Sequence, residues 1–312
     1  MIGPLPRAGQ NLDAAPPAGN LSALMANRSG SNPARGLGWG PFLLGFVPGL
    51  LHYQLGQKRR AAVAFASCTA LFFVGWLLVR ERLFYWALLT PDAGGSGVLR
   101  GAARVGIVTT LPELLNLPGF ALGGILAFDG TPTGERLWRM PVELEHLGAF
   151  LTGASGMLAA FWSAHAHWLL RLARDGGEAP PSPIADPALC AGLSWLVPGL
   201  GHARVGQKDK GLLLGGAVAL VFAMGLLFSH GHAVDRANAS VWWMGQNLFG
   251  GGSLFAALVT GPWRMVGEPP DLQLGVVLCT VAGLMNLVVM VDAFTVAERS
   301  AFPLRRPQEA AA

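Results

Sequence analysis

Long apolar runs alternate with short polar links along this chain. Two of the runs, Ala61–Val79 and Gly211–Phe228, contain no charged residue. Leu147–Leu170 and Leu272–Val291 are similarly long and predominantly apolar. A helix needs roughly 20 apolar residues to cross about 30 Å of hydrocarbon. The pattern therefore predicts four membrane-spanning helices.

Four further apolar segments are interrupted by helix-breaking residues. They are residues 36–55, 105–128, 189–205 and 240–260, each with Pro or Gly in its interior. Proline kinks a helix, and carbonyl groups freed in lipid need partners from neighbouring helices or water. These segments are either kinked spans or half-helices that turn back. We favour an all-α polytopic membrane protein with four helices in each half.

The runs fall into two similar halves. The sequence VPGLLHYQLGQK at residues 47–58 recurs as VPGLGHARVGQK at residues 197–208, an offset of 198 − 48 = 150. Repeats of this size organise a whole fold, so we expect two tandem copies of one membrane unit. The motif residues are Pro48, Gly49, His52 and Gly56 in the first copy, and Pro198, Gly199, Gly201, His202 and Gly206 in the second.

The closing run of each half aligns with a shorter offset. Placing Gly156 on Gly283 gives 283 − 156 = 127, and the same offset puts His165 opposite Asp292. The Pro-rich stretch between the halves marks a boundary. We therefore predict five regions: a disordered arm 1–35, membrane repeat 36–171, polar linker 172–187, membrane repeat 188–299 and a disordered tail 300–312.

Composition supports the membrane class. Of 312 residues, 52% are hydrophobic and only 13% are charged, whereas soluble domains carry about 25% charged residues. The net charge of +4 comes from short clusters, not from the continuous basic stripe of a nucleic-acid surface. Cys68, Cys190 and Cys279 lie in apolar runs without CxxC spacing, so we expect buried thiols and no disulfide or zinc frame.

The two motif copies resemble the P-G-x-G-H-x-x-x-G signature of small bacterial membrane proteins of unknown function. They are more loosely similar to the TM2-domain family, in which a Gly-rich helix, a similar stretch and a second helix form a hairpin. The resemblance implies a multi-pass helical module of the bacterial inner membrane and no known chemistry. Basic links at residues 57–60 and 207–210 are expected on the cytoplasmic side.

Polar residues inside the interrupted segments are candidates for function. Glu113 is the most costly to bury and needs a partner such as Arg104 or a water-filled cavity. The polar residues could line a path at the interface of the two halves, or simply hydrogen-bond neighbouring helices and hold the bundle together. The candidates for such a path are Glu113, Asn116, Gln246, Asn247, His165 and Asp292.

The motif histidines, His52 and His202, are expected at headgroup depth. There they would donate to a loop carbonyl or a lipid phosphate and fix the turn, or else act as ligands or proton relays. His165 and His167 stand two positions apart and face different sides of a helix, so we predict no metal and no cofactor. Trp242 and Trp243 are interpreted as interfacial anchors.

The sequence contains no GxSxG, HExxH, P-loop or CxxC motif, and we assign no catalytic residue. Our first hypothesis is a non-enzymatic scaffold or assembly module with the lipid bilayer and other membrane proteins as partners. The alternative is a transporter-like protein with a polar path between the halves. A weaker alternative is a membrane enzyme or haem protein that uses His52, His165, His167 and His202.

Overall fold

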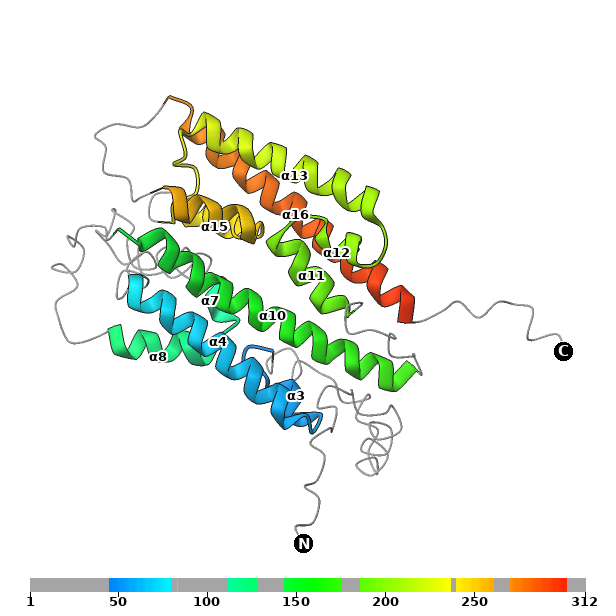
Figure 1. Cartoon of the computed structure of the whole chain (residues 1–312). Helices are drawn as coiled ribbons and strands as arrows, with labels where there is room; N and C mark the ends of the chain where they lie inside the picture. Colours follow the sequence, from blue (N-terminus) through cyan, green and yellow to red (C-terminus); the bar gives the residue numbers. More distant parts are fainter. Residues whose placement is uncertain are drawn as a thin grey trace, which may run out of the picture.

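The computed structural model describes residues 45–79, 83, 111–127, 143–175, 186–236, 240–260 and 270–301. Within these ranges every regular element is a helix (Figure 1). The predicted arm 1–35, the middle of the linker and the tail beyond Ala301 lie outside the described residues, as does Arg104. The predicted fold class, all-α and polytopic, is confirmed for the described chain.

Four helices are long and apolar enough to cross a membrane. They are α4 (Lys58–Val79), α10 (Glu145–Asp175), α13 (Lys208–Phe228) and α16 (Leu272–Ala301). Each contains one of the four uninterrupted runs, so the predicted spans are confirmed as helices of membrane-spanning length and composition. The protein is therefore a polytopic membrane protein.

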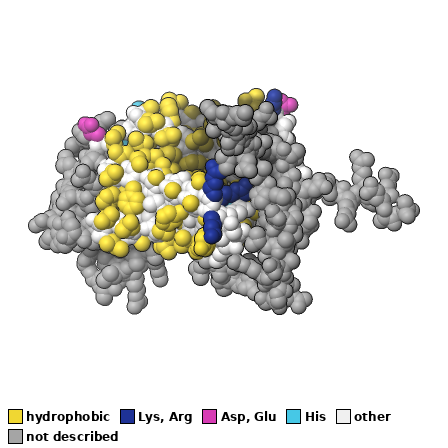
Figure 2. All heavy atoms as spheres, turned by 60° about the horizontal axis from the view of Figure 1, so that its bottom comes forward, with side chains coloured by type: hydrophobic (Ala, Val, Ile, Leu, Met, Phe, Trp, Pro, Cys, Tyr) yellow, Lys and Arg dark blue, Asp and Glu magenta, His cyan; other side chains and the backbone are white. Residues whose placement is uncertain are grey.

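The outer surface of the bundle is apolar, as expected for lipid contact. On α13, Leu212 and Leu227 are 79% and 77% exposed, while Phe222 is 4% exposed. Figure 2 shows one face, where hydrophobic side chains make up a large continuous area and a group of Lys and Arg side chains borders it near the middle of the view. Exposed apolar area on this scale would be unfavourable in water, and it fits a hydrocarbon solvent.

Among the described residues, the four interrupted segments are divided into short helices, as expected for half-helices, so each half keeps its four predicted apolar segments. The first half contains α3 (Leu50–Gln54), α4, α7 (Leu111–Leu114), α8 (Leu117–Ala127) and α10; the second contains α11 (Pro187–Leu196), α12 (Leu200–Arg204), α13, α14 (Ser240–Gln246), α15 (Gly250–Val259) and α16. Backbone breaks at Pro-Gly and Gly-rich positions divide the segments. An eleven-residue helix is only about 16 Å long, so none of these short helices crosses alone.

The long helices pair antiparallel within each half, through small residues. A Cβ on Gly75 of α4 would lie 2.7 Å from the carbonyl oxygen of Gly148 on α10. A Cβ on Gly225 of α13 would lie 2.9 Å from that of Gly275 on α16. Small residues allow membrane helices to approach closely and gain dispersion contacts. Any larger side chain at these crossings would separate the helix pair.

Both helix pairs place their basic ends at the same end of the bundle. Arg171 near the end of α10 bonds Glu298 near the end of α16 at 2.5 Å, and Lys210 at the start of α13 bonds Asp292 at 2.5 Å. In Figure 1 this is the end that carries α3 and α12. We call it the basic end. The long helices of each half are antiparallel, so the start of the first and the end of the second lie at this same end and bring their charged residues together.

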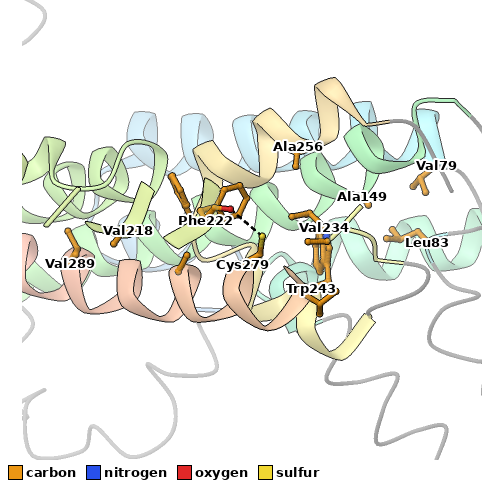
Figure 3. Packing of buried hydrophobic residues seen from close by; sticks show 14 of the residues in the cluster. Val79, Leu83, Ala149, Val218, Phe222, Val234, Trp243, Ala256, Cys279 and Val289 are labelled. Atoms are coloured by element: carbon orange, nitrogen blue, oxygen red, sulfur yellow. Dashed lines mark hydrogen bonds between the residues drawn. The ribbon is translucent and has the colours of Figure 1, made fainter. Parts of the chain in front are cut away.

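The apolar core is shared by both halves. Phe72 of α4 belongs to the same buried cluster as Val218 and Phe222 of α13 and Cys279 of α16. In Figure 3 the Cys279 side chain points at Phe222, whose carbonyl oxygen accepts a weak bond from the thiol at 3.7 Å. All three cysteines are buried, as predicted, and none of them forms a disulfide. Continuous packing across the two helix pairs makes them one bundle.

Candidate functional site

The two Pro-Gly turns have the same backbone conformation. Gly49 and Gly199 have φ angles of 82° and 81°, in the left-handed region that disfavours residues with a Cβ. A Cβ on Gly49 would also overlap the carbonyl oxygen of Ala61, and one on Gly199 would overlap that of Gly211. Each turn thereby lays a five-residue helix, α3 or α12, against the first turn of the next long helix.

The second copy is packed more tightly than the first at one motif position. Gly201 in α12 stands where the first copy has Leu51, and a Cβ there would overlap the carbonyl oxygen of Cys190 in α11. The Gly201 amide also donates to the Ser194 hydroxyl at 3.1 Å. Gly201 therefore permits α11 and α12 to touch.

The first motif histidine begins a hydrogen-bonded chain at the basic end. His52 is 1% exposed, and its Nε2 lies 2.8 Å from Nδ1 of His165 on α10. Nε2 of His165 lies 2.9 Å from Oδ2 of Asp186, the N-cap residue of α11. With His165 donating to the carboxylate, its Nδ1 is an acceptor. His52 then donates to His165, and the chain ties three elements together.

His52 is held in its neutral form. Burial, together with the neighbouring His165 and Arg60 and opposed by Asp186, lowers the pKa of His52 from 6.5 to about 4. A neutral imidazole can supply the single Nε2–H that the chain requires. The pKa and the hydrogen-bond geometry therefore describe the same protonation state.

The second motif histidine has a carboxylate as its partner. Nε2 of His202, which is fully buried, lies 2.6 Å from Oδ2 of Asp292 on α16. The same oxygen binds Lys210 at 2.5 Å. Both motif histidines were predicted to bond a loop carbonyl or a lipid phosphate, and that prediction is wrong. Their partners are side chains of the long helices, at the two positions that the offset of 127 aligned.

A second polar cluster lies towards the other end of the bundle. Glu113 of α7 is fully buried and accepts from Arg236 at 2.5 Å and from Thr152 of α10 at 3.0 Å. The Arg236 guanidinium also lies 4.4 Å from the ring centre of Trp243. Arg236 precedes α14 in the second half, so this ion pair joins the two halves inside the core.

One turn of α10, residues 152–156, gathers the polar candidates of both halves. Asn116 donates to Ser155 Oγ at 3.2 Å and to the Cys68 carbonyl at 3.0 Å. Asn247 packs against Gly153 of α10, because a Cβ added to Gly153 would lie 2.7 Å from the side-chain nitrogen of Asn247. The carbonyl oxygen of Ala233 accepts from the neighbouring Gln246 at 2.9 Å. Hydrogen bonds between elements thus engage the side-chain nitrogens of Asn116 and Gln246, whereas neither polar atom of the buried Asn247 side chain has a hydrogen-bond partner.

The six predicted path residues lie in two separate clusters. Glu113, Asn116 and Asn247 contact residues 152–156 of α10, and Gln246, next to Asn247 in sequence, bonds the carbonyls of Ala233 and Val276. His165 and Asp292 lie at the basic end. From Thr152 to His165 the distance along α10 is about 20 Å, at 1.5 Å per residue. A path between the halves stays a prediction.

Three residues central to these clusters were not singled out as candidates in the sequence. Arg236 lies in a polar link, and no local pattern connects it with Glu113, 123 positions away. Trp243 was interpreted as an interfacial anchor, yet it is 3% exposed beneath Arg236, and that interpretation is wrong. Asp186 did carry a signal, because Asp before Pro is typical of a helix N-cap followed by its first residue.

Two cavities open beside the helices. One, of about 620 Å³, lies between α11, α13 and α15 and is lined by Gly215, Gly216, Gly251 and Gly252 among apolar neighbours. The other, of about 540 Å³, lies between α4, α10 and α11 and has Arg60, His165 and Asp186 in its wall. We call them the glycine groove and the α4–α10–α11 cavity.

Candidate metal ligands do not converge in the described part of the chain. No group of three or more His, Cys, Asp or Glu side chains among these residues is arranged to hold a metal ion. His167 is exposed and points away from the chain formed by His52 and His165. The arrangement is suited to holding elements together through hydrogen bonds.

Comparison with known proteins gives one match. Residues 189–304 match a family of unknown function, DUF6677. The match covers the second half from α11 to just beyond α16, and includes the second motif copy. No curated protein and no solved structure shows a significant match to the chain. The second half is thus similar to an uncharacterised family, which assigns no activity.

Proposed function

We propose that the protein is a non-enzymatic scaffold or assembly module of the bacterial inner membrane. It consists of two tandem copies of one helical unit and acts through contacts with partner helices and lipids. The observation that carries this proposal is the Glu113–Arg236 ion pair, buried between the halves and bonded to Thr152. A polar group used in this way holds two helix pairs in one fixed arrangement.

Matching contacts support the tandem copies. Gly156 of α10 packs against the carbonyl of Pro112, and Gly283, 127 positions later, packs against that of Gly245. The residues that follow these carbonyls are Glu113 and Gln246, both fully buried. In each half an interrupted segment therefore crosses the last long helix at the equivalent glycine. Duplication of one unit would produce this match.

The transporter alternative finds less support in the geometry. A transport path needs polar groups that face water or substrate. The Glu113 cluster is occupied by contacts between helices and lines neither of the two cavities, and of the six path candidates only His165 lies in a wall of these cavities. The small-residue glycine groove offers a partner helix a close approach, which favours an assembly role.

Site-specific photo-cross-linking in living cells tests the scaffold. A photoreactive residue at Ala219, exposed in the glycine groove, should capture a defined membrane protein. Gly216→Leu fills the groove, since a Cβ at Gly216 meets nothing within 4 Å, and should reduce that capture about tenfold. Val288→Leu on the exposed face of α16 is the matched control. Equal background capture in all three proteins would contradict the scaffold.

A flux assay separates the scaffold from the transporter. Proteoliposomes holding the purified protein and a pH-sensitive dye should show the same proton leak as empty vesicles. A proton flux that disappears in Glu113→Gln would replace the scaffold with the transporter-like function.

A further inference from the structure

We propose that the α4–α10–α11 cavity binds one acyl chain of a phospholipid, with the Arg60 guanidinium holding the lipid phosphate. The cavity has a volume of about 540 Å³, within the range of roughly 300–1,000 Å³ typical of ligand sites. The site is separate from the glycine groove and does not depend on the scaffold function.

The depth of the cavity matches one leaflet. Its walls run along residues 60–71 of α4, 154–165 of α10 and 186–196, which are the N-cap and the whole of α11, so each covers about ten residues. At 1.5 Å per residue this is about 15 Å, half of the roughly 30 Å hydrocarbon core. The polar residue of each wall, Arg60, His165 or Asp186, lies at the basic end. The cavity therefore runs from headgroup level to the middle of the bilayer.

The deeper wall is apolar and aromatic. Phe161, Trp162 and Trp195 line it together with leucine and alanine side chains. Gly192 of α11 leaves space in this wall, because a Cβ there would make ordinary contact with Phe161 at 3.5 Å. A wall of this kind accepts a hydrocarbon chain through dispersion contacts and offers it few polar groups.

Charge at the mouth selects an anion. Arg60 donates one bond to the neutral Gln57 side chain at 3.1 Å, and no carboxylate among the described residues forms an ion pair with it. The nearby Asp186 carboxylate is already engaged, since Oδ1 accepts from the amides of Ala188 and Leu189 and Oδ2 from His165. The remaining guanidinium donors fit a phosphate, which arginine binds in a bidentate manner.

The matching position in the second copy has its charge neutralised. Lys210 stands 150 positions after Arg60, and it binds Asp292 at 2.5 Å. In the first copy the position of Asp292 is held by His165, which brings no negative charge. The same basic position is thus closed in one copy and open to an outside anion in the other.

Photo-cross-linking with a phosphatidylglycerol that carries a diazirine in one acyl chain tests the cavity. The full-length protein is reconstituted in vesicles of that lipid in phosphatidylcholine, and labelled peptides are mapped by mass spectrometry. Labels are expected on α10 and α11. Gly192→Leu, which fills the cavity, should reduce them about tenfold, while Gly216→Leu in the glycine groove should leave them unchanged.

The headgroup contact is tested with paired arginine variants. Arg60→Gln should lower phosphatidylglycerol labelling about tenfold, because it removes a charge-assisted bond, and the exposed neighbour variant Arg59→Gln should not. A diacylglycerol probe with the same chain should be insensitive to Arg60→Gln. Excess inorganic phosphate should not displace the chain; displacement would assign the site to a soluble phosphate and overturn the proposal.

A second cavity-filling variant guards against misfolding. Leu158→Trp narrows the cavity from α10 and should repeat the effect of Gly192→Leu at an unchanged melting temperature. Labelling that persists in both variants, or that falls equally in Arg59→Gln and Arg60→Gln, would show that the lipid lies elsewhere.

Discussion

The two motif turns share a backbone and differ in what their histidines bind. Gly49 and Gly199 have nearly the same left-handed conformation, and both histidines are buried. His52 bonds the imidazole of His165, whereas His202 bonds the carboxylate of Asp292. The glycine turn therefore fixes where the histidine points. The equivalent position on the facing long helix is occupied by His165 in one half and by Asp292 in the other.

This difference changes the electrostatics of each copy. In the second copy Asp292 neutralises Lys210 within the protein. In the first copy a neutral chain ends at Asp186, and Arg60 forms no ion pair among the described residues. A common turn can thus support a closed, self-neutralised site in one half and an open one in the other.

The largest expected effect is shared by both copies, because it acts on the turn. Gly49→Val and Gly199→Val combine a left-handed backbone with overlap of a facing carbonyl. Each should destabilise the protein by about 4 kcal/mol, measured by thermal unfolding in detergent. Gly206→Ala is the control, since its φ is +87° but a Cβ meets nothing within 4 Å. If only one of the two valine variants were destabilised, the two turns would not be structurally equivalent.

The next effect is expected at the join between the halves. Glu113→Gln leaves the buried Arg236 without its carboxylate and should destabilise the protein by about 3 kcal/mol. Replacing both residues with leucine should recover much of that loss. A double-mutant cycle measures the coupling between the two positions. Additive losses would mean that the ion pair does not couple the halves.

Acid should act on the first turn through His52. Its pKa is lowered from 6.5 to about 4, so between these pH values the unfolded chain binds a proton that the folded chain does not. The contribution of His52 to stability is therefore constant above pH 6.5 and falls by about 3 kcal/mol in total as the pH drops towards 4. Thermal melts from pH 7.5 to 4 measure this. The His52→Asn variant should lack the loss, and retention of the full loss would contradict the assignment.

The smallest effect is expected for Asp292→Asn. The Asp292 side chain is 38% exposed, so solvent screens its attraction to Lys210. The loss should be below about 1 kcal/mol, as for other exposed pairs. A loss as large as that of Glu113→Gln in the same melts would show that the second turn depends on its carboxylate.

The sequence contained enough information for the long helices and the turns. Uninterrupted apolar runs predicted α4, α10, α13 and α16 because hydrocarbon thickness fixes the length that a spanning helix needs. The two offsets, 150 and 127, also placed His165 and Asp292 in equivalent slots. Such features depend on local composition and on likeness between two stretches of one chain.

The interior partners could not be predicted in the same way. Glu113 was expected to need a cation, but its partner is Arg236, which lies far away in sequence. Trp243 looked like an interfacial residue because hydropathy does not distinguish lipid contact from burial under a guanidinium. Pro and Gly indicated where the interrupted segments break, without indicating how many short helices each would form among the described residues.

Because each half contributes two antiparallel long helices, the first of them begins and the last of them ends at the same end of the bundle. Under the duplication proposed above, a gene that encoded one such hairpin could be fused end to end with its own copy, and the joint would not need to pass through lipid. Neither copy would have to change its orientation during insertion. After the fusion each copy could also mutate alone, so one could keep an exposed basic group while the other acquired an internal counter-charge.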